Sequence, residues 1–500
     1  MAPIRTAAVP RTGPANRAQA GRAPVAASRT GLDQADVQGL VGSGYGRLPE
    51  AEFLGLRIDD GAAARAFLTA LIPQVTSMAS SRSSRSSRAL NIALAYTGLA
   101  RLGLPEAALD AFSLEFRAGM VTPTRSAFLG DEGENVPSTW AWGGPGTPRV
   151  DVLLFLYAES PAELAEFRDW VRRLMGTDGV VEVVALPTAS LSPRDHLGFA
   201  DGISQPEVAD LHGTRGEADV PLGEFLLGYP NAYGRRTGRP FLPAETDTTG
   251  VLPTAPRAEA PDSVDFGRNG TYLVARTFGL DVGAFWEHAG RWAARTGLSP
   301  DLLAAKMVGR WPSGTSLTVS PDHDDDAQPV GNDFRYHRDG DALGLGCPVA
   351  AHVRRANPRD SLDPRPGSDA AVHVNNRHRL IRRGRQYGPP PGDPEHAADE
   401  RGLHFLCLNA NISRQFEFVQ HTWLNSPAFA GLQDSPDPIA GHRPEATGVF
   451  PIPATPVRHR LLELPAFASV RGGGYFFLPG VRALTYLASG PGTSTVIRSD

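Results

Sequence analysis

Apolar and polar positions in the first 190 residues follow two periods, which predict alternating strands and helices. Three segments have the alternating or unbroken apolar pattern of strands, residues 51–58, 150–157 and 180–185. Apolar side chains recur at helical spacing in four segments, residues 60–72, 91–102, 105–116 and 161–175. The order strand, helices, strand, helix, strand predicts an α+β unit that ends near residue 190.

A similar pattern returns in the second half of the chain. Strands are predicted at three places, residues 270–278, residues 404–409 and a final pair near 475–478. Helices are predicted over residues 281–294, 300–308 and 413–423. Polar or glycine- and proline-rich segments are predicted to be loops, residues 79–88, 221–265, 312–346 and 355–377. Because strand–helix–strand order occurs twice, the pattern predicts a duplicated α+β module.

Composition narrows the class of protein. The chain has 500 residues, of which 41% are hydrophobic and 21% charged, so we expect a folded protein of more than one domain. A net charge of −5 provides no field that would attract nucleic acid. No run reaches the ~18 apolar residues of a membrane span, so we expect neither a membrane nor a nucleic-acid partner.

The first 35 residues are rich in Ala, Arg and Pro and contain no acid before Asp33. They lack the apolar core of a secretory signal and an Arg-Arg pair, so we expect a disordered tail on a cytoplasmic protein. The expected domains are residues 36–215 and 216–500.

Cysteine usage limits the available cofactor chemistry. Cys347 and Cys407 are the two cysteines of the chain, too few for a disulfide framework or a cysteine-rich metal site. Neither lies in a Cys-x-x-Cys-His motif, which excludes haem attached through thioethers. The thirteen histidines remain available as metal ligands.

Three segments carry side chains in unusual settings. Asp201 lies between two glycines in a tight turn that could present its carboxylate to a cavity, although an ordinary Asx turn is the commoner explanation. His352 follows small and apolar residues, as a metal ligand or a packed core histidine would. Arg382 follows two aliphatic residues, an unusual place for a guanidinium unless an anionic group lies nearby.

Together these segments resemble those of the dye-decolourising peroxidase family of haem proteins. Residues Gly198–Gly202 match the family's Gly-x-x-Asp-Gly signature. Residues Ala351–Arg359 resemble the segment with the proximal haem ligand, and Ile381–Gly384 the segment with the distal arginine. Weaker matches extend from residue 36 to about residue 480. The resemblance implies two ferredoxin-like domains with antiparallel sheets and flanking helices, the C-terminal one binding haem.

The resemblance also implies roles around one non-covalently bound haem b per chain. His352 would be the iron ligand, and Asp437, in an Asp-Pro-Ile sequence, would be the acid that accepts its second ring N–H. An ordinary turn or helix-start aspartate is an alternative for Asp437. Phe405 would line the haem pocket, or would simply pack in a core strand.

On the opposite face, Asp201 would move a proton between the two oxygens of H2O2, and Arg382 would stabilise the charge that develops on them. The implied reaction is the oxidation of phenolic or dye-like donors, small aromatic reductants, by H2O2 through a ferryl intermediate. Bulky dyes would need a surface relay, for which Tyr387, Trp423 and Tyr336 are candidates unless they are ordinary packed aromatics.

Two alternatives from other classes remain at this point. One is a haem-binding or iron-releasing protein with incidental peroxidase activity. The other is a catalytically silent assembly module on the same fold, which we would expect to lack His352, Asp201 or Arg382. Assembly into a homo-oligomer is left open.

Overall fold

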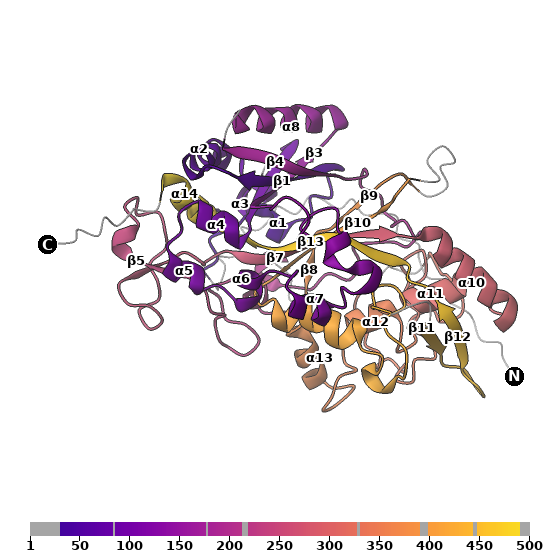
Figure 1. The fold of residues 1–500 in the computed structure, drawn as a ribbon. Coiled ribbons are helices and arrows are strands. Elements are labelled where there is room, and N and C mark those ends of the chain that lie inside the picture. The colour runs from indigo at the N-terminus through magenta and orange to yellow at the C-terminus, as the bar shows by residue number, and fades with distance from the viewer. Residues whose placement is uncertain are drawn as a thin grey trace, which may run out of the picture.

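Within the part of the chain that the computed structural model describes, nine strands join in one antiparallel sheet (Figure 1). The model describes residues 31–83, 86–176, 179–212, 219–327, 331–390, 399–443 and 448–490. Along the sheet the strands are β4 (Val180–Pro187), β1 (Glu50–Ile58), β3 (Val152–Ala158), β2 (Arg88–Leu94), β13 (Ala468–Leu478), β7 (Thr271–Leu280), β10 (Gly402–Asn409) and β8 (Ile381–Arg382), and β9 (Arg385–Tyr387) also pairs with β10. Most of the predicted tail and the predicted boundary at residues 215/216 lie outside the described residues.

The sheet has two parts that come from the two halves of the chain. Strands β1 to β4 form one part, and β7 to β10 with β13 form the other. The parts meet between β2 and β13, where Leu94 lies opposite Phe477. Two two-stranded sheets lie apart from it, β5 (Phe241–Pro243) with β6 (Ser263–Asp265) and β11 (Gly448–Ile452) with β12 (His459–Leu464).

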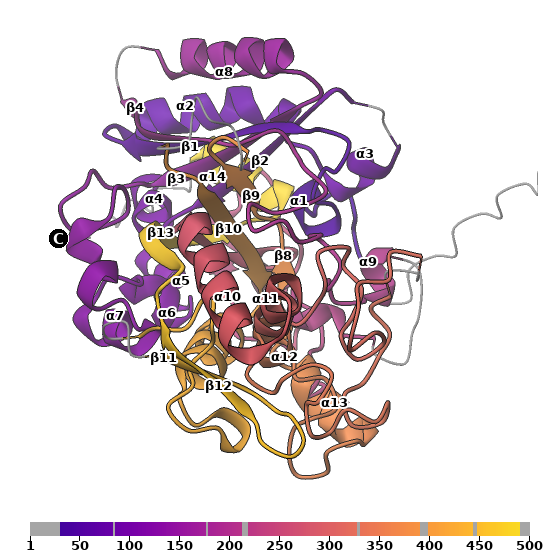
Figure 2. The ribbon, with the colours of Figure 1, turned by 90° about the vertical axis from the view of Figure 1, so that its right-hand side faces the viewer.

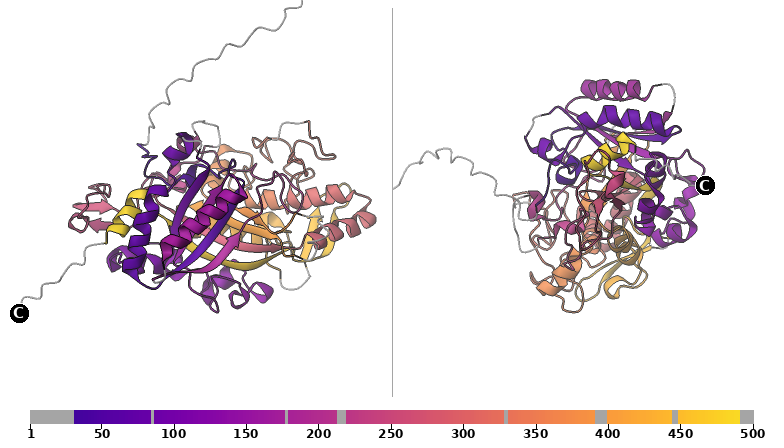
Figure 3. Two further views of the ribbon diagram at one scale, coloured as in Figure 1. Left: turned by 90° about the horizontal axis from the view of Figure 1, so that it is seen from above. Right: turned by 90° about the vertical axis from the view of Figure 1, so that its left-hand side faces the viewer.

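Helices cover both parts of the sheet. In the first part α2 (Gly61–Leu71) and α8 (Pro161–Met175) lie on the outer face of the strands, at the top of Figures 1 and 2. The last helix, α14 (Val481–Ser489), packs beside α2 (Figure 3). In the second part α10 (Val282–Thr296) packs on α11 (Pro300–Val308) next to the β11–β12 hairpin. The remaining α-helices are short: α1 (Gly39–Gly42), α3 (Met78–Ser83), α4 (Tyr96–Arg101), α5 (Glu106–Asp110), α6 (Leu114–Ala118), α7 (Pro123–Leu129), α9 (Ala209–His212), α12 (His352–Ala356) and α13 (Asp369–Asn376).

The unbroken apolar run of β3 reflects burial on both faces of the sheet. Leu154 and Leu156 join one hydrophobic cluster with side chains of α2 and α8. The alternate residues Leu153, Phe155 and Tyr157 join a second cluster on the opposite face. A central strand that is covered on both sides has no need of polar positions.

The predicted helix over 91–102 is wrong in its first half, which forms β2. Residues 88–94 pair with β3, and α4 begins only at Tyr96. A short run of small and apolar residues fits both periods, so the tertiary pairing decides between them. The polar Asn91 is tolerated at this buried position because it bonds Gln38 and Tyr45.

Segments that the pattern predicted to be loops contain helical residues. The 79–88 segment begins inside α3, and the 355–377 segment contains the end of α12 and all of α13. Ser368 caps α13 by accepting the amide N–H of Ala371, a signal that the prediction missed. The predicted 413–423 helix is present but is a π-helix over Ser413–Glu417 and Val419–Asn425, and the 105–116 helix is split into α5 and α6.

Among the described residues, no helix combines the length and the apolar character that a membrane crossing requires.

Candidate active site

A largely apolar cavity lies in the second half of the molecule, beside β7 and β10. Its empty volume is about 1150 Å³, including open solvent at its mouth. The apolar lining comes from both strands, from α12, from the π-helical segment and from the loop after Asp437: Phe278, Leu280, Val353, Ala356, Leu380, Leu403, Phe405, Phe416, Val419, Leu424, Ile439, Ala440 and Ala468. Its polar lining residues are Ser204, His352, Asn357, His378, Arg379, Arg382 and Gln420.

His352 reaches the cavity from the first residue of α12. Its Nδ1 lies 3.1 Å from both carboxylate oxygens of Asp437. An ionised carboxylate only accepts hydrogen bonds, so Nδ1 carries the ring proton and Nε2 keeps its lone pair. Nε2 has no protein partner among the described residues. The ring is therefore fixed in the tautomer that can ligate a metal through Nε2.

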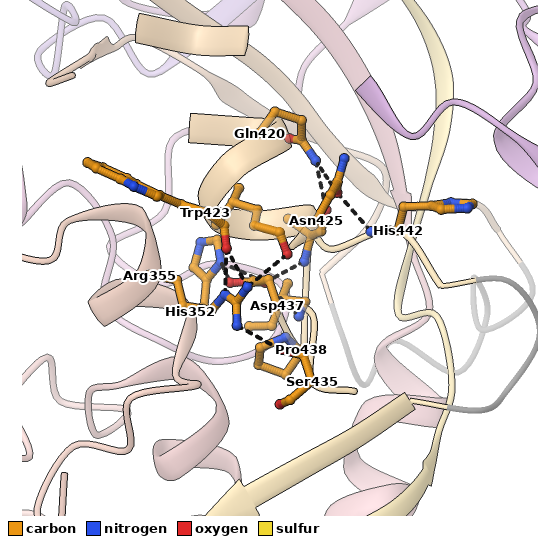
Figure 4. Close-up of polar contacts among 12 residues, drawn as sticks. His352, Arg355, Gln420, Trp423, Asn425, Ser435, Asp437, Pro438 and His442 are labelled. Carbon is orange, nitrogen blue, oxygen red and sulfur yellow. Dashed lines mark hydrogen bonds and ion pairs between the residues drawn. The ribbon is translucent and has the colours of Figure 1, made fainter. Parts of the chain in front are cut away.

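Asp437 is fully buried, and Figure 4 shows the polar contacts around it. Its Oδ1 also accepts the amide N–H groups of Ile439 and Ala440, at 2.9 and 2.8 Å. Burial acts to raise the pKa of Asp437, but His352, Arg355 and these hydrogen bonds outweigh burial and lower it below its usual value. The sequence predicted this pair, and the structure brings both residues together.

Arg382 faces the same cavity from the two-residue strand β8. Its backbone is fixed by Gln205, which donates to its carbonyl and accepts its N–H, both at 3.1 Å. Within the described residues the guanidinium has no hydrogen-bonded protein partner. Its donors therefore remain available to an anionic or polarised oxygen in the cavity.

Asp201 lies outside the cavity lining. In the turn that carries it, the N–H of Asp195 donates to the carbonyl of Phe199, and the N–H of Phe199 donates to the Asp195 carboxylate. The N–H of Ala200 donates to the carbonyl of Pro312. The Asp201 side chain is exposed, and its Oδ1 accepts the N–H of Gly202 at 2.6 Å. The structure thus brings His352 and Arg382 to one cavity, with Asp437 bonded to His352, and leaves Asp201 outside the cavity lining.

The predicted aromatic residues have different settings. Phe405 lines the cavity and packs against Phe278, with ring centroids 6.3 Å apart. Of the three candidate relays, Tyr336 is fully buried and Trp423 nearly so. Tyr387 is partly exposed, stacks on His404 at 4.6 Å and donates from its hydroxyl to Glu400 at 3.2 Å.

Sequence reasoning missed the other polar residues of the cavity. Arg379 precedes Arg382 by three positions, and both flank an aliphatic pair, which is the signal that could have found it. His378 donates from Nδ1 to the carbonyl of Arg414 at 2.6 Å and stacks on Phe418 at 4.1 Å. Asn357 comes from the end of α12. Nothing in the local sequence pattern distinguishes Asn357 from a surface asparagine.

The cavity residues fit haem b, which has a flat apolar ring, a central iron and two carboxylates. The apolar walls match the ring, and Nε2 of His352 matches an axial iron ligand. Burial and repulsion from Arg359 and Arg382 lower the pKa of Arg379 to about 9, with Glu207 opposing them. This excess of buried positive charge at one side of the cavity suits a group that brings two negative charges.

Comparisons with known proteins agree with this geometry. The chain is 30% identical to the multifunctional dye peroxidase of an Amycolatopsis species over 423 residues, which cover 80% of this chain and 82% of the relative. It is 29% identical to "Peroxidase 2" of Mycetinis scorodonius over 93% of this chain and 89% of the relative. A crystal structure of a fungal DyP-type peroxidase from Auricularia auricula-judae superposes with a TM-score of 0.74 at 25% identity, covering 91% of this chain and 99% of that one. A scan against protein-family models found no match.

The α+β fold and the cavity with its histidine, together with these relatives, define a haem peroxidase. More specifically, the chain belongs to the dye-decolourising peroxidase family. This confirms the predicted family, the ferredoxin-like α+β fold class, haem b as the cofactor, and the H2O2-dependent oxidation of dye-like or phenolic donors. The roles of individual residues do not follow from the family alone.

Proposed function

We propose that His352 is the axial iron ligand of this peroxidase and that Asp437 keeps it in the ligating tautomer. The observation that carries the proposal is the hydrogen bond of Nδ1 to the buried carboxylate, which leaves the lone pair of Nε2 at the cavity. A histidine whose second nitrogen donates to a carboxylate is a more electron-rich ligand than a free one. Phe405, on the cavity wall, would pack against the haem ring.

Haem b, when bound, supplies the redox-active iron through which electrons from the donor reduce H2O2. Arg382 would bind a peroxide oxygen in the cavity, because it lines the cavity and its guanidinium has no competing protein acceptor among the described residues. Preorganised donors of this kind stabilise charge as it develops, since no reorientation is needed when the O–O bond breaks.

Asp201 would take a proton from one peroxide oxygen and return it to the other. Its side chain is exposed and is not part of the cavity lining, so this role requires the carboxylate to turn toward the cavity. The glycines that bracket the segment, Gly198 and Gly202, have φ of 94° and 78°, and neither would meet another atom with an added Cβ. The surroundings of these two glycines are therefore uncrowded, which favours a change in the conformation of the turn.

The partners that we propose are H2O2 and a small aromatic reductant. Tyr387 is the candidate relay for donors too large for the cavity, because it alone of the three aromatics is partly exposed. A cytoplasmic location and a lack of nucleic-acid or membrane partners remain predictions from the sequence.

Imidazole rescue tests the ligand assignment. We expect His352→Ala to lose the absorption band of ligated haem and the H2O2-dependent oxidation of a phenol, and both to return with added imidazole. His378→Ala is the matched control, because His378 lines the same cavity, and it should keep both properties. Loss of ligation in His378→Ala with retention in His352→Ala would overturn the proposal.

A further inference from the structure

Two buried guanidiniums lie near Asp437 on the side of the cavity that carries His352. Arg355 is fully buried and Arg443 is 9% exposed. Arg355 comes from α12, one turn after His352, and Arg443 comes from the loop that follows Asp437. Figure 4 shows Arg355 next to the His352–Asp437 pair.

Arg355 holds the end of the π-helical segment against the Asp437 loop. Its Nε donates to the carbonyl of Trp423 at 2.8 Å, and its Nη2 donates to that of Ser426 at 2.6 Å. Its Nη1 donates to the carbonyl of Ser435 at 2.7 Å. The guanidinium therefore fixes the distance between two backbone segments that meet at Asp437.

Arg443 makes fewer hydrogen bonds, and both of those described lie within its own loop. Its Nη1 donates to the carbonyl of Asp437 at 2.9 Å, and its Nη2 donates to that of Pro438 at 3.0 Å. A substitution of Arg443 therefore disturbs fewer segments than one of Arg355.

The positive charges of Arg355 and Arg443 are not balanced by an equal number of neighbouring carboxylates. Neither guanidinium forms an ion pair with a carboxylate at hydrogen-bond distance within the described part of the chain. Burial lowers the pKa of each arginine to about 10, and the charge of Asp437 is the influence that opposes burial for both. At neutral pH, two buried cations thus share one buried anion.

We propose that Arg355 and Arg443 are positioning residues that set the electron donation of His352 to the iron, by fixing Asp437 and offsetting its negative charge. The inference rests on the proposed ligation by His352. A carboxylate at Nδ1 increases the electron density on Nε2 and favours ferric iron. Nearby positive charge moderates this effect, because it attracts the same electron density toward the carboxylate.

The potential of the ferric/ferrous couple tests the inference, measured by spectroelectrochemistry on the full-length protein loaded with haem. We expect Arg443→Met to shift the equilibrium about tenfold toward ferric iron, which is about 59 mV for a one-electron couple. The iron–histidine stretching frequency of the ferrous protein should rise in the same variant. Arg443→Lys keeps the charge and should stay within about threefold of the wild type.

Arg354→Met is the matched control. Arg354 lies beside Arg355 in α12, is buried like both arginines and donates to the carbonyl of Cys347, but its charge is paired with Asp341. We expect it to leave the potential unchanged. In a protein that already carries Asp437→Asn, Arg443→Met should shift the potential much less, because the arginine acts through that carboxylate.

Three results would overturn the inference: an unchanged or raised potential in Arg443→Met, an equal shift in Arg443→Lys, or a full-sized shift in the Asp437→Asn background. A wild-type protein without an iron–histidine vibration would instead contradict the proposed ligation itself. The two failures are therefore distinguishable.

Discussion

At the scale of single residues, the side chains at the cavity differ in how well their surroundings fix them. The ring of His352 is fixed by a buried carboxylate, whereas the guanidinium of Arg382 is fixed only through its backbone. Asp201 has a fixed turn and an exposed side chain. Because their settings differ, we expect substitutions of these residues to differ in their effect on the reaction with H2O2.

Arg382→Leu should slow the reaction with H2O2 more than Asp201→Asn. Loss of one preorganised donor costs about 2.7–4 kcal/mol of transition-state stabilisation, a 100- to 1000-fold decrease in rate. Stopped-flow absorption of the haem after mixing with H2O2 measures this step. Unchanged rates in both variants would contradict the assignment of the site, and a larger loss in Asp201→Asn would contradict the ranking.

The sequence singled out His352, Asp437 and Arg382 because each lies in a segment with a recognisable motif. The structure places His352 and Arg382 on one cavity and Asp437 against the ring of His352, and the roles of the three stay predictions. Arg379 was missed because the aliphatic pair between it and Arg382 was taken as a signal for Arg382 alone. That Arg379 lines the cavity, with Arg359 close enough to lower its pKa, is a property of the folded chain. The exposure of Asp201 outside the cavity lining is likewise a property of the folded turn.

At the scale of elements, the predictions were correct where a segment fitted one period and wrong where it fitted both. β3 was predicted because burial on both faces leaves an unbroken apolar segment. β2 was mistaken for helix because its seven residues fit either period, and pairing with β3 decided the outcome. The π-helical register of residues 413–425 has no counterpart in the hydrophobic pattern.

Helix α10 contains a buried histidine that predicts acid sensitivity. His288 is fully buried, neither ring nitrogen has a hydrogen-bond partner, and burial lowers its pKa to about 4. Between pH 6.5 and 4 the unfolded chain binds a proton that the folded chain does not, so stability falls as the pH falls. A shift from about 6.5 to about 4 corresponds to at most about 3 kcal/mol.

His288→Phe should remove this part of the pH dependence, because a phenyl ring can fill the site beside Phe467 without taking up a proton. Urea unfolding at pH 7 and pH 4.5 measures the difference for both proteins. The wild type should lose more stability between the two pH values than the variant. An equal loss would contradict the account of His288.

At the scale of the whole molecule, both ends of the described chain meet at Asp36. Its carbonyl and carboxylate accept the amide N–H groups of Val481 and Arg482, and the carboxylate also accepts from Asn269. The first part of the sheet therefore has contacts with the second part beyond the β2–β13 junction. We therefore expect the two parts to unfold together, in one cooperative transition.

Removal of haem should destabilise the whole protein, because the cavity joins segments from β7, α12, β10 and the loop after Asp437. A ligand at 1,000 times its Kd stabilises the folded state by about 4 kcal/mol. Urea unfolding of the haem-free and haem-loaded protein checks this value. Equal stabilities of the two forms would indicate that the cavity does not bind the cofactor.

The central claim is that Nε2 of His352 binds the iron, and resonance Raman spectroscopy of the ferrous protein tests it most directly. The account predicts an iron–histidine stretching band that shifts when the protein is labelled with ¹⁵N-histidine and is absent in His352→Ala. A labelled band that persists unchanged in His352→Ala would contradict it.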